Sequence, residues 1–414
     1  MKHKTIYIIF FLLWLSNHTS AQQKVTNLPD VLTMSTGKKV TTAKQWEKQR
    51  KPELLAFFKR EMYGQMPGKP AGIAFKVFDE NKNVLGGKAT RKQVTVYFTG
   101  NVDGPKMDIL MYIPNKVKRK VPAIVGLNFD GNQSVNADPA IKITTSWEDK
   151  GTKGVINNHA TEAMRGTNAS QWPLEMIIDK GYAIATVYRG DIDPDFEGGL
   201  PLGVRSLYPE LQNRGDNFST VSAWAWGLSR ILDYLETDKA IDSKHVAVFG
   251  FSRLGKAALW AGVTDERFKL VISNESGAGG AKLFHYTAGE GIRRLCTKFP
   301  HWFCGNFKKY MDQDSILSFD QHMVISMIAP RPVYVASAQG DSNSNPEGEF
   351  WGAKNAEPVY KLYNSNYSLP TDSWPALNTP AVGRIAYHIR PGGHDVKDYD
   401  WIQYLNFADK YLKK

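Results

Sequence analysis

A serine stands between two glycines at the point where a short apolar run gives way to a helical pattern. Residues Gly250–Lys256 read Gly-Phe-Ser-Arg-Leu-Gly-Lys and continue the apolar run that begins at Val246. A buried strand that turns sharply into a helix exposes a serine hydroxyl at the end of a sheet, where the hydroxyl can attack a carbonyl carbon. In the common form of this motif the second glycine would stand at position 254, but here it is Gly255. We predict that Ser252 is a catalytic nucleophile.

A histidine close to the C-terminus supplies the base that such a serine needs. His394 lies in the sequence Arg-Pro-Gly-Gly-His-Asp, between the last apolar run and the last helical pattern. A serine followed much later by a histidine is the order found in α/β-hydrolases. We expect His394 to remove the proton of Ser252 and then to protonate the leaving alcohol.

Two carboxylates compete for the third place in a catalytic triad. Glu275 follows the apolar run 270–272, in Ser-Asn-Glu-Ser-Gly, and Asp341 follows the run 333–336, in Gln-Gly-Asp. Either side chain can orient His394 and stabilise its imidazolium form. The residues alone slightly favour Asp341, because a carboxylate after the next strand holds the usual hydrolase position.

A permanent cation directly follows the serine. The guanidinium of Arg253 and its backbone N–H at a helix N-terminus can both meet the negative charge that forms on the carbonyl oxygen. Lys256 lies one helical turn beyond Ser252 and on the same face. Without further information, Lys256 is a solvated helix residue and Glu290, in Gly-Glu-Gly, is a loop charge.

Short apolar runs without alternation predict the strands that position these residues. Such runs suit strands that are buried on both faces of a parallel sheet; they occupy residues 121–127, 183–187, 246–250, 270–272, 333–336 and 385–387. Helical patterns at 219–236, 253–263 and 396–412 lie between or after them, and another covers 43–63. Strands at 93–98 and 107–113 precede this alternation. We predict an α/β protein with an α/β-hydrolase fold, a three-layer αβα sandwich around a mostly parallel sheet, with long loop insertions at 129–175, 276–329 and 338–380.

The N-terminus reads as an export signal rather than as part of the fold. Lys2 and Lys4 precede ten apolar residues, Ile6–Leu15, and small residues follow at 19–21. Ten apolar residues are too few to cross a hydrocarbon core, which takes about twenty. We expect a signal peptide over residues 1–21, cut after Ala21, and a single catalytic domain over 22–414. The mature protein would be periplasmic or secreted, with no membrane anchor.

Composition and charge narrow the class of partner. The chain has 42% hydrophobic and 22% charged residues, which excludes a disordered, collagen-like or coiled-coil protein. Its net charge of +11 favours an acidic polysaccharide or only high solubility. The sequence has no long block of Lys and Arg that would indicate binding of nucleic acid. We expect a monomer without cofactor or metal, since triad chemistry needs neither. Cys296 and Cys304 allow a disulfide or two separate thiols equally well.

The motifs around the serine resemble those of the glucuronoyl esterases, carbohydrate esterase family 15. The resemblance rests on Gly-x-Ser-Arg-x-Gly-Lys, on a glutamate 23 residues after the serine in Asn-Glu-Ser-Gly, and on the late Gly-Gly-His. Segments Trp224–Arg230, Phe299–Phe303 and Gly348–Phe350 agree as well, and the similarity covers roughly residues 45–412. The family hydrolyses the ester between the carboxyl group of a glucuronic acid branch on xylan, 4-O-methylated or not, and an alcohol thought to come from lignin.

This resemblance assigns roles to charged residues that sequence position leaves open. The usual acid of the family corresponds to Glu275, and bacterial members also, or instead, carry an aspartate at the position of Asp341. We therefore expect Glu275 as the acid, with Asp341 as a second one. Arg253 corresponds to the oxyanion-stabilising arginine. Lys256 and Glu290 correspond to residues that bind hydroxyl groups of the uronic acid ring.

One position departs from the family pattern. Many relatives have a tryptophan that contacts the sugar two residues after the Asp341 position, where this chain has Asn343. We expect Trp351, eight residues further on, to substitute for it.

Three hypotheses of function follow from these observations. The first is an exported serine esterase acting on glucuronate esters of glucuronoxylan, as in lignin–carbohydrate linkages, through an acyl-enzyme. The second is an acetyl-xylan or other carbohydrate acetyl esterase, which needs only a small acyl slot. The third is a carbohydrate-binding protein that has lost catalysis. The complete set of serine, histidine, acid and arginine counts against the third hypothesis.

Overall fold

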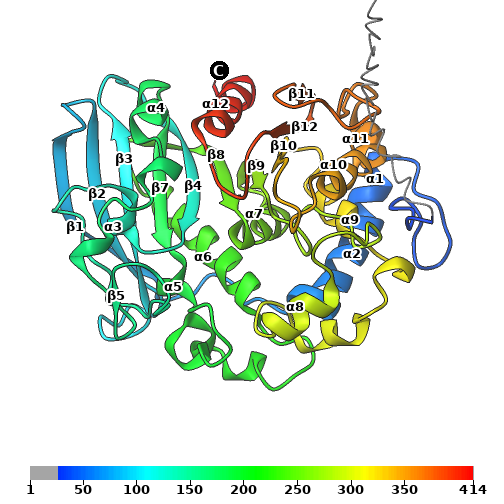
Figure 1. Cartoon of the computed structure of the whole chain (residues 1–414), viewed down its shortest axis with the longest axis horizontal. Helices are drawn as coiled ribbons and strands as arrows, with labels where there is room; N and C mark the ends of the chain where they lie inside the picture. Colours follow the sequence, from blue (N-terminus) through cyan, green and yellow to red (C-terminus); the bar gives the residue numbers. More distant parts are fainter. Residues whose placement is uncertain (1–26, 414) are drawn as a thin grey trace, which may run out of the picture.

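A ten-stranded sheet runs through the protein (Figure 1), as seen in a computed structural model that describes residues 27–413. The predicted signal peptide, residues 1–21, lies outside the described residues. The strand order is β1-β2-β3-β7-β4-β8-β9-β10-β12-β11. From β7 to β12 every neighbouring pair is parallel, and the pairs on either side of this block are antiparallel. The mostly parallel sheet expected from the sequence is therefore confirmed.

Eight of the ten strands overlap the predicted strands, whereas β1 and β11 correspond to none of them. Their bounds are β1 Ala74–Val84, β2 Ala89–Tyr97, β3 Lys106–Pro114, β4 Val121–Asn128, β7 Ala183–Tyr188, β8 Ile241–Phe251, β9 Phe268–Asn274, β10 Val333–Ala338, β11 Ala381–Val382 and β12 Ile385–Arg390. A separate two-stranded ribbon consists of β5 Val155–Ile156 and β6 His159–Ala160.

Helices cover both faces of the sheet and fill the long insertions. Their bounds are α1 Ala43–Gln45, α2 Lys51–Phe58, α3 Asn132–Val135, α4 Leu174–Asp179, α5 Arg189–Ile192, α6 Thr220–Leu235, α7 Arg253–Thr264, α8 Ile292–Lys298, α9 Gln321–Ser326, α10 Pro346–Lys354, α11 Glu357–Tyr363 and α12 Asp398–Leu412. Two π-helical turns, Trp46–Arg50 and Lys59–Tyr63, join α1 and α2 into the helical stretch predicted over 43–63. The predicted helices at 219–236, 253–263 and 396–412 correspond to α6, α7 and α12.

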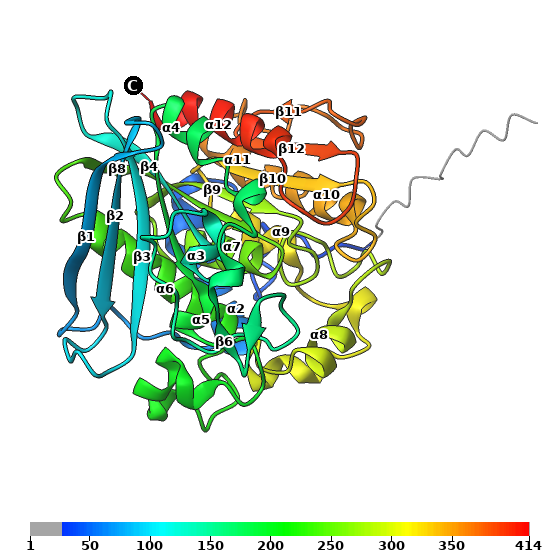
Figure 2. The ribbon, with the colours of Figure 1, turned by 60° about the vertical axis from the view of Figure 1, so that its left-hand side comes forward.

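Two hydrophobic cores separate the three layers of the sandwich. One core packs α6, α7, α9 and α10 against one face of the sheet. The other packs α4 and α12 against the opposite face, where Trp172, Trp401 and Tyr404 surround Phe249 of β8. Figure 2 shows α4 and α12 together along one side of the sheet. The predicted αβα sandwich is confirmed, since the alternating apolar runs and helices bury one helix layer on each face.

Two further features bear on the sequence-based expectations. Both cysteines are free thiols, Cys304 buried and Cys296 half-buried. None of the helices in residues 27–413 combines the length and the apolar character needed to cross a bilayer.

Candidate active site

The backbone at Ser252 is strained in the way that a nucleophile turn requires. Ser252 joins the end of β8 to the start of α7 and has φ +56° and ψ −131°, a left-handed region that is costly for a residue with a side chain. Gly250 makes this turn possible, because a Cβ atom there would lie 2.0 Å from the carbonyl oxygen of Leu254. Gly255 has the matching role, because its Cβ would lie 2.8 Å from Cβ of Ser276 on the neighbouring turn.

A hydrogen-bonded chain runs from the serine through the histidine to two carboxylates. Nε2 of His394 lies 2.8 Å from Oγ of Ser252. On the other side of the ring, Nδ1 lies 2.6 Å from Oδ2 of Asp341 and 3.0 Å from Oε2 of Glu275. The carboxyl ends of β8, β9, β10 and β12 meet at one edge of the sheet, which is why residues 142 positions apart come into contact.

The two carboxylates differ in their electrostatic environment. Burial opposes ionisation of Asp341, but its hydrogen bonds from His394 and Ser344 outweigh burial and hold its pKa below the usual value. Burial dominates at Glu275 and raises its pKa to about 7. Glu275 also accepts a hydrogen bond from Nη2 of Arg390 at 2.6 Å, so part of its charge is already compensated. Asp341 is therefore the closer and more fully ionised partner of His394, although the family resemblance points first to Glu275.

The histidine is held as a strong base by this pair. Burial opposes its charged form, but the hydrogen bonds to Asp341 and Glu275 outweigh burial and raise the pKa of His394 to about 9. The carboxylates thus stabilise the imidazolium that forms when a proton leaves Ser252.

A buried aspartate fixes the guanidinium beside the serine. Asp195, whose side chain is 2% exposed, accepts a hydrogen bond from Nη1 of Arg253 at 2.5 Å. The same carboxylate contacts Nη1 of Arg189 at 2.9 Å, Nε2 of His301 at 2.9 Å and Nε1 of Trp302 at 2.7 Å. The charges of Arg189 and Arg253 and the bonds from His301 and Trp302 outweigh burial and lower the pKa of Asp195 far below its usual value.

Aromatic rings complete the setting of Arg253. Its guanidinium carbon lies 4.8 Å from the ring centre of Trp302 and 5.5 Å from that of Phe299, and these two rings stack on each other. The Nε atom of Arg253 is buried without a hydrogen-bond partner. The guanidinium lines the catalytic cavity beside Ser252, where its positive charge can stabilise a developing oxyanion.

The predicted sugar-binding residues also come together. Nζ of Lys256, a residue that is 3% exposed, donates to the carbonyl oxygens of Ser276 at 2.7 Å and Ala278 at 2.6 Å. It lies 3.4 Å from Oε2 of Glu290, and burial lowers its pKa. The backbone carbonyl of Glu290 is held in turn by Nζ of Lys282 at 2.7 Å.

One cavity of about 200 Å³ collects these side chains. It is lined by Ser252, Arg253, Lys256, Glu275, Ser276, Glu290, Arg294, Phe299, Trp302, Asp341, Asn343, Ser344 and His394. Every site residue predicted from the sequence except Trp351 lines it. The indole of Trp351 packs edge-on against Phe350 and donates to Glu347 at 3.4 Å. Asn343 lines the cavity, whereas Trp351 is not among its lining residues.

Several lining residues escaped the sequence-based assignment. Phe299 and Trp302 belong to the segment that resembles the family. An aromatic cluster in a long insertion is a signal from which they could have been predicted as lining residues. Arg294 lies near Glu290, with Nε 3.7 Å from Oε1. Asp195 stands in no recognisable motif, and Arg390 begins the Arg-Pro-Gly-Gly-His-Asp segment of His394 without any spacing that marks it as a partner of Glu275.

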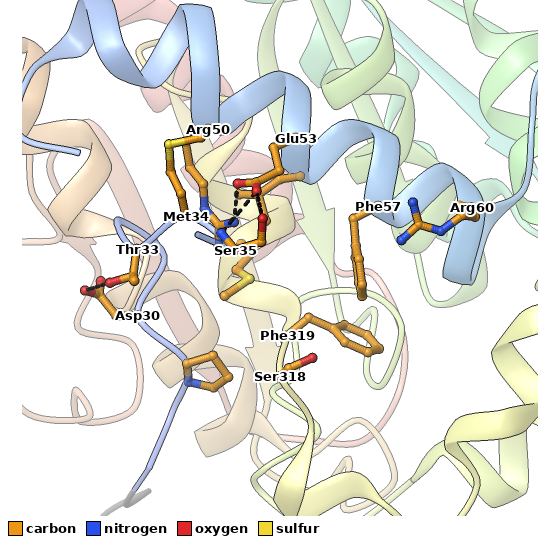
Figure 3. Close-up of a pocket in the computed structure, with 13 residues that line it drawn as sticks. Asp30, Thr33, Met34, Ser35, Arg50, Glu53, Phe57, Arg60, Ser318 and Phe319 are labelled. Carbon is orange, nitrogen blue, oxygen red and sulfur yellow. Dashed lines mark hydrogen bonds and ion pairs between the residues drawn. The ribbon is translucent and has the colours of Figure 1, made fainter. Parts of the chain in front are cut away.

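A second, larger cavity lacks a comparable constellation. It measures about 620 Å³ and lies between the N-terminal segment, α2 and the segment before α9 (Figure 3). Its charged groups are paired: Glu53 accepts hydrogen bonds from Arg50 at 2.7 Å and from the backbone of Ser35 at 3.0 Å, and Asp30 accepts one from Thr33 at 2.7 Å. None of the residues lining it is a histidine or a cysteine, so it holds no serine–histidine pair like that of the catalytic cavity.

The side chains that could hold a metal ion are those of the catalytic group itself. Within residues 27–413, Glu275, Asp341 and His394 are the set of three ligand-type side chains whose ligand atoms lie within 4.8 Å of one another. Their geometry is explained without an ion, since both carboxylates bind Nδ1 of the histidine and Arg390 compensates Glu275.

The site combines a serine on a strained strand–helix turn, a histidine hydrogen-bonded to its hydroxyl and carboxylates hydrogen-bonded to the histidine. All of them lie at the carboxyl edge of a parallel sheet. This arrangement defines the class of α/β-hydrolase serine hydrolases. A family model described as "Glucuronyl esterase, fungi" matches residues 199–364. The chain is 44% identical over 402 residues to carbohydrate esterase MZ0003 from an unknown prokaryotic organism, covering 96% of this chain and 92% of that protein.

Two solved structures show the same likeness over almost the whole chain. A glucuronoyl esterase from Solibacter usitatus matches with a TM-score of 0.87 and 45% identity, over 93% of this chain and 97% of that one. A CE15 esterase from a marine bacterial metagenome, described as promiscuous, matches with a TM-score of 0.86 and 44% identity over the same shares, 93% and 97%. The chain belongs to carbohydrate esterase family 15, the glucuronoyl esterases, which confirms the resemblance drawn from its motifs. It is a carboxylic ester hydrolase.

Proposed function

We propose that this enzyme hydrolyses esters of glucuronic acid side chains of glucuronoxylan, as in lignin–carbohydrate linkages, through an acyl-enzyme on Ser252. The observation that carries the proposal is that Ser252, Arg253 and the pair Lys256–Glu290 line one cavity. A uronate ester needs both a nucleophile at its carbonyl carbon and polar groups around its ring hydroxyls, and this cavity offers both.

The reaction proceeds in two steps. In the first step His394 takes the proton of Ser252 while Oγ attacks the ester carbonyl carbon, and Arg253 stabilises the oxyanion. The imidazolium then protonates the departing alcohol, which leaves the uronic acid esterified to Ser252. In the second step His394 takes a proton from water, the resulting hydroxide attacks the acyl-enzyme, and the uronic acid is released with the Ser252 proton restored. Asp341 and Glu275 hold the imidazole in the tautomer that this sequence requires.

A direct test compares an ester of the sugar acid with an ester on the sugar. We expect rapid hydrolysis of benzyl glucuronate and slow release of acetate from acetylated xylan by the same preparation. The opposite ranking would contradict the proposed substrate class and support an acetyl esterase.

One observation favours a broader specificity as the second candidate. Asn343, rather than a tryptophan, lines the cavity, and Trp351 is not among its lining residues. An amide packs less area against a pyranose ring than an indole does. Acetyl esters of carbohydrates are therefore the second substrate class that we infer, and a relative that is 44% identical is itself described as promiscuous.

We further propose that the enzyme acts outside the cytoplasm, in the periplasm or after secretion. The charged, apolar and small-residue regions of residues 1–21 support export. N-terminal sequencing of protein recovered from the outside of expressing cells should give Gln22 as the first residue, and a mature chain that still begins at Met1 would contradict this.

The buried aspartate next to Arg253 is expected to act as a positioning residue. Arg253→Gln should lower kcat by about 10²–10³, since it removes a cationic oxyanion donor. Asp195→Asn keeps the shape but removes the charge that holds Arg253, so we expect about a tenfold fall in kcat at nearly unchanged KM. Both constants can be measured on benzyl glucuronate.

A matched variant separates positioning from stability. Asp193→Asn removes an equally buried carboxylate, which binds Arg205 at 2.9 Å and does not contact Arg253. We expect it to lower the melting temperature without a comparable fall in kcat. If both aspartate variants lower kcat alike, Asp195 has only a structural role.

The glutamate opposite Lys256 is expected to decide recognition of the sugar ring. Glu290→Gln removes a charged acceptor, and a hydrogen bond to a charged group contributes about 1.5–3 kcal/mol, or roughly tenfold or more in KM. We expect this rise for benzyl glucuronate and no change for 4-nitrophenyl acetate, which has no ring hydroxyls. Glu347→Gln, outside the cavity beside Trp351, is the control that should leave both substrates unaffected. An equal loss on both substrates would show that Glu290 acts on the reaction centre rather than on the sugar.

A further inference from the structure

A third cavity lies at the edge of the sheet opposite the edge that carries the catalytic cavity. Strands β8, β9, β10 and β12 are parallel neighbours, so their amino ends share one edge just as their carboxyl ends share the other. A cavity of about 240 Å³ at the amino edge is lined by Lys244, His245, Lys269, Arg331, Pro332, Arg384 and Tyr411. We refer to these seven residues as the basic cavity.

The chain contributes a cation at the amino end of each of the four strands. Lys244 lies within the first part of β8 and Lys269 is the second residue of β9. Arg331 stands two residues before β10, and Arg384 stands directly before β12. Lys269 is also the residue that a register shift between β8 and β9 leaves out of the regular pairing. Such bulges redirect a side chain, and they are frequent next to functional sites.

No acidic residue lines the basic cavity, and the carboxylates of Glu266 and Asp265 act on Arg331 from outside it without forming an ion pair. Within residues 27–413, none of its four Lys and Arg side chains forms an ion pair with a carboxylate. Arg331 donates only to the backbone carbonyls of Asp265, Phe268 and Gly262, Arg384 to that of Pro330, and Lys269 to that of Glu266.

Other charged groups of the chain behave differently. In the larger cavity of Figure 3, Arg50 is paired with Glu53. Asp242, next to the basic cavity, is held by Nδ1 of His245 at 2.7 Å. Four unpaired cations around one hollow repel one another, and a bound anion relieves that repulsion.

The shape of the cavity limits the ligand to a small oxyanion or one sugar unit. Its volume of about 240 Å³ lies below the range of about 300–1,000 Å³ typical of sites for drug-sized ligands. Arg384 is held in place by the rings of Tyr367 and Tyr411, at 4.8 and 4.9 Å from its guanidinium carbon. A planar carboxylate suits a fixed guanidinium flanked by mobile ammonium groups.

We propose that the basic cavity binds the free carboxylate of a uronic acid on the polysaccharide, apart from the site that cleaves the ester. This inference rests on the proposed function, because glucuronoxylan then presents both the ester that is cleaved and the free acid that is produced. The catalytic cavity takes the neutral ester, whereas the basic cavity selects the charged acid. Binding of free acids on the same polymer would raise the local concentration of the remaining esters.

Calorimetry at low salt tests the proposal with the Ser252→Ala enzyme, which does not turn over its ligand. The probes are xylotriose carrying one 4-O-methylglucuronic acid, the methyl ester of the same compound, and inorganic phosphate. We compare this enzyme with one that also carries Lys244→Glu and Lys269→Glu. Affinity for the free acid should fall by about tenfold or more, because two cationic partners of a carboxylate become anionic. Affinity for the methyl ester should stay the same.

Controls decide between the remaining outcomes. Lys76→Glu with Lys82→Glu, two exposed lysines of the edge strand β1 at the other end of the strand order from β12, makes the same change of charge and should have no such effect. Equal binding of the free acid with and without Lys244→Glu and Lys269→Glu would overturn the proposal. It would also be overturned if those changes abolish binding of phosphate and leave that of the free acid unchanged, since the cavity would then be a site for inorganic oxyanions.

The failure of the proposed function would look different. The Lys244→Glu, Lys269→Glu enzyme with Ser252 intact should hydrolyse benzyl glucuronate as the parent does. If the parent itself does not cleave benzyl glucuronate, the proposed substrate is wrong, but binding of the free acid still decides the role of the basic cavity.

Discussion

Ser252→Ala should lower kcat on benzyl glucuronate by about 10⁶, the loss seen when the nucleophile of a serine triad is removed. Oγ of Ser252 is the atom 2.8 Å from Nε2 of His394, and without it no acyl-enzyme forms. His394→Ala should cost nearly as much, and the double variant little more than either single one, because the two side chains act as one unit. Steady-state kinetics on the three variants measure this non-additivity.

The strained turn provides a control that is independent of activity. Ser252→Gly removes the same hydroxyl, but glycine tolerates the φ of +56° that alanine does not. Both variants should be equally inactive, whereas the glycine variant should have a higher melting temperature than the alanine variant. Activity of Ser252→Ala close to that of the parent would refute the catalytic assignment. Equal melting temperatures would show that the turn is not strained.

The sequence predicts those parts of the fold that leave a local signal. Apolar runs without alternation predict the parallel strands. The turn at Gly250 is predicted because a strand runs there directly into a helix. Strand β1 left no such signal: it lies at the edge of the sheet, and most of its side chains from Ala74 to Asn83 are partly or fully exposed. Edge strands of this kind lack both the continuous run and the regular alternation.

The same reasoning explains which site residues could be found. Ser252 and His394 stand in glycine-rich turns that follow strands, so their meeting is dictated by sheet topology. Asp195 and Arg390 act through long-range contacts, with Arg253 and Glu275 respectively, that no spacing in the sequence reveals. The direction of Trp351 depends on how α10 packs, and its indole donates to Glu347 instead of lining the catalytic cavity.

Simultaneous replacement of both carboxylates, Glu275→Gln with Asp341→Asn, should lower kcat by about 10⁴, as happens when a triad loses its orienting carboxylate. Each single variant should lower kcat by far less than about 10², the loss expected if the two carboxylates contributed equally and independently. The reason is that the remaining carboxylate still lies within 3.0 Å of Nδ1 of His394. Asp341→Asn should be the more harmful single change, since Asp341 is closer and its pKa is lowered, whereas burial raises the pKa of Glu275 to about 7. A double-mutant cycle on kcat measures the coupling.

The pH profile gives a second readout for the same variants. His394 must be neutral to accept the proton of Ser252, so kcat/KM rises as the pH increases through the pKa of His394. Burial favours the neutral ring, and the hydrogen bonds to Asp341 and Glu275 outweigh it, raising that pKa to about 9. Removing the charge of Asp341 therefore shifts the acidic limb of the profile to lower pH, and removing both charges shifts it further.

The two measurements together identify the dominant acid. If Glu275→Gln alone abolishes turnover while Asp341→Asn leaves both rate and profile unchanged, the shared arrangement is wrong and Glu275 is the sole partner of His394. If Asp341→Asn alone abolishes turnover, Asp341 is the sole partner of His394, and Glu275 serves only as the acceptor of the hydrogen bond from Arg390. Sharing requires that each single variant retains substantial activity and that the acidic limb moves further with Asp341→Asn than with Glu275→Gln.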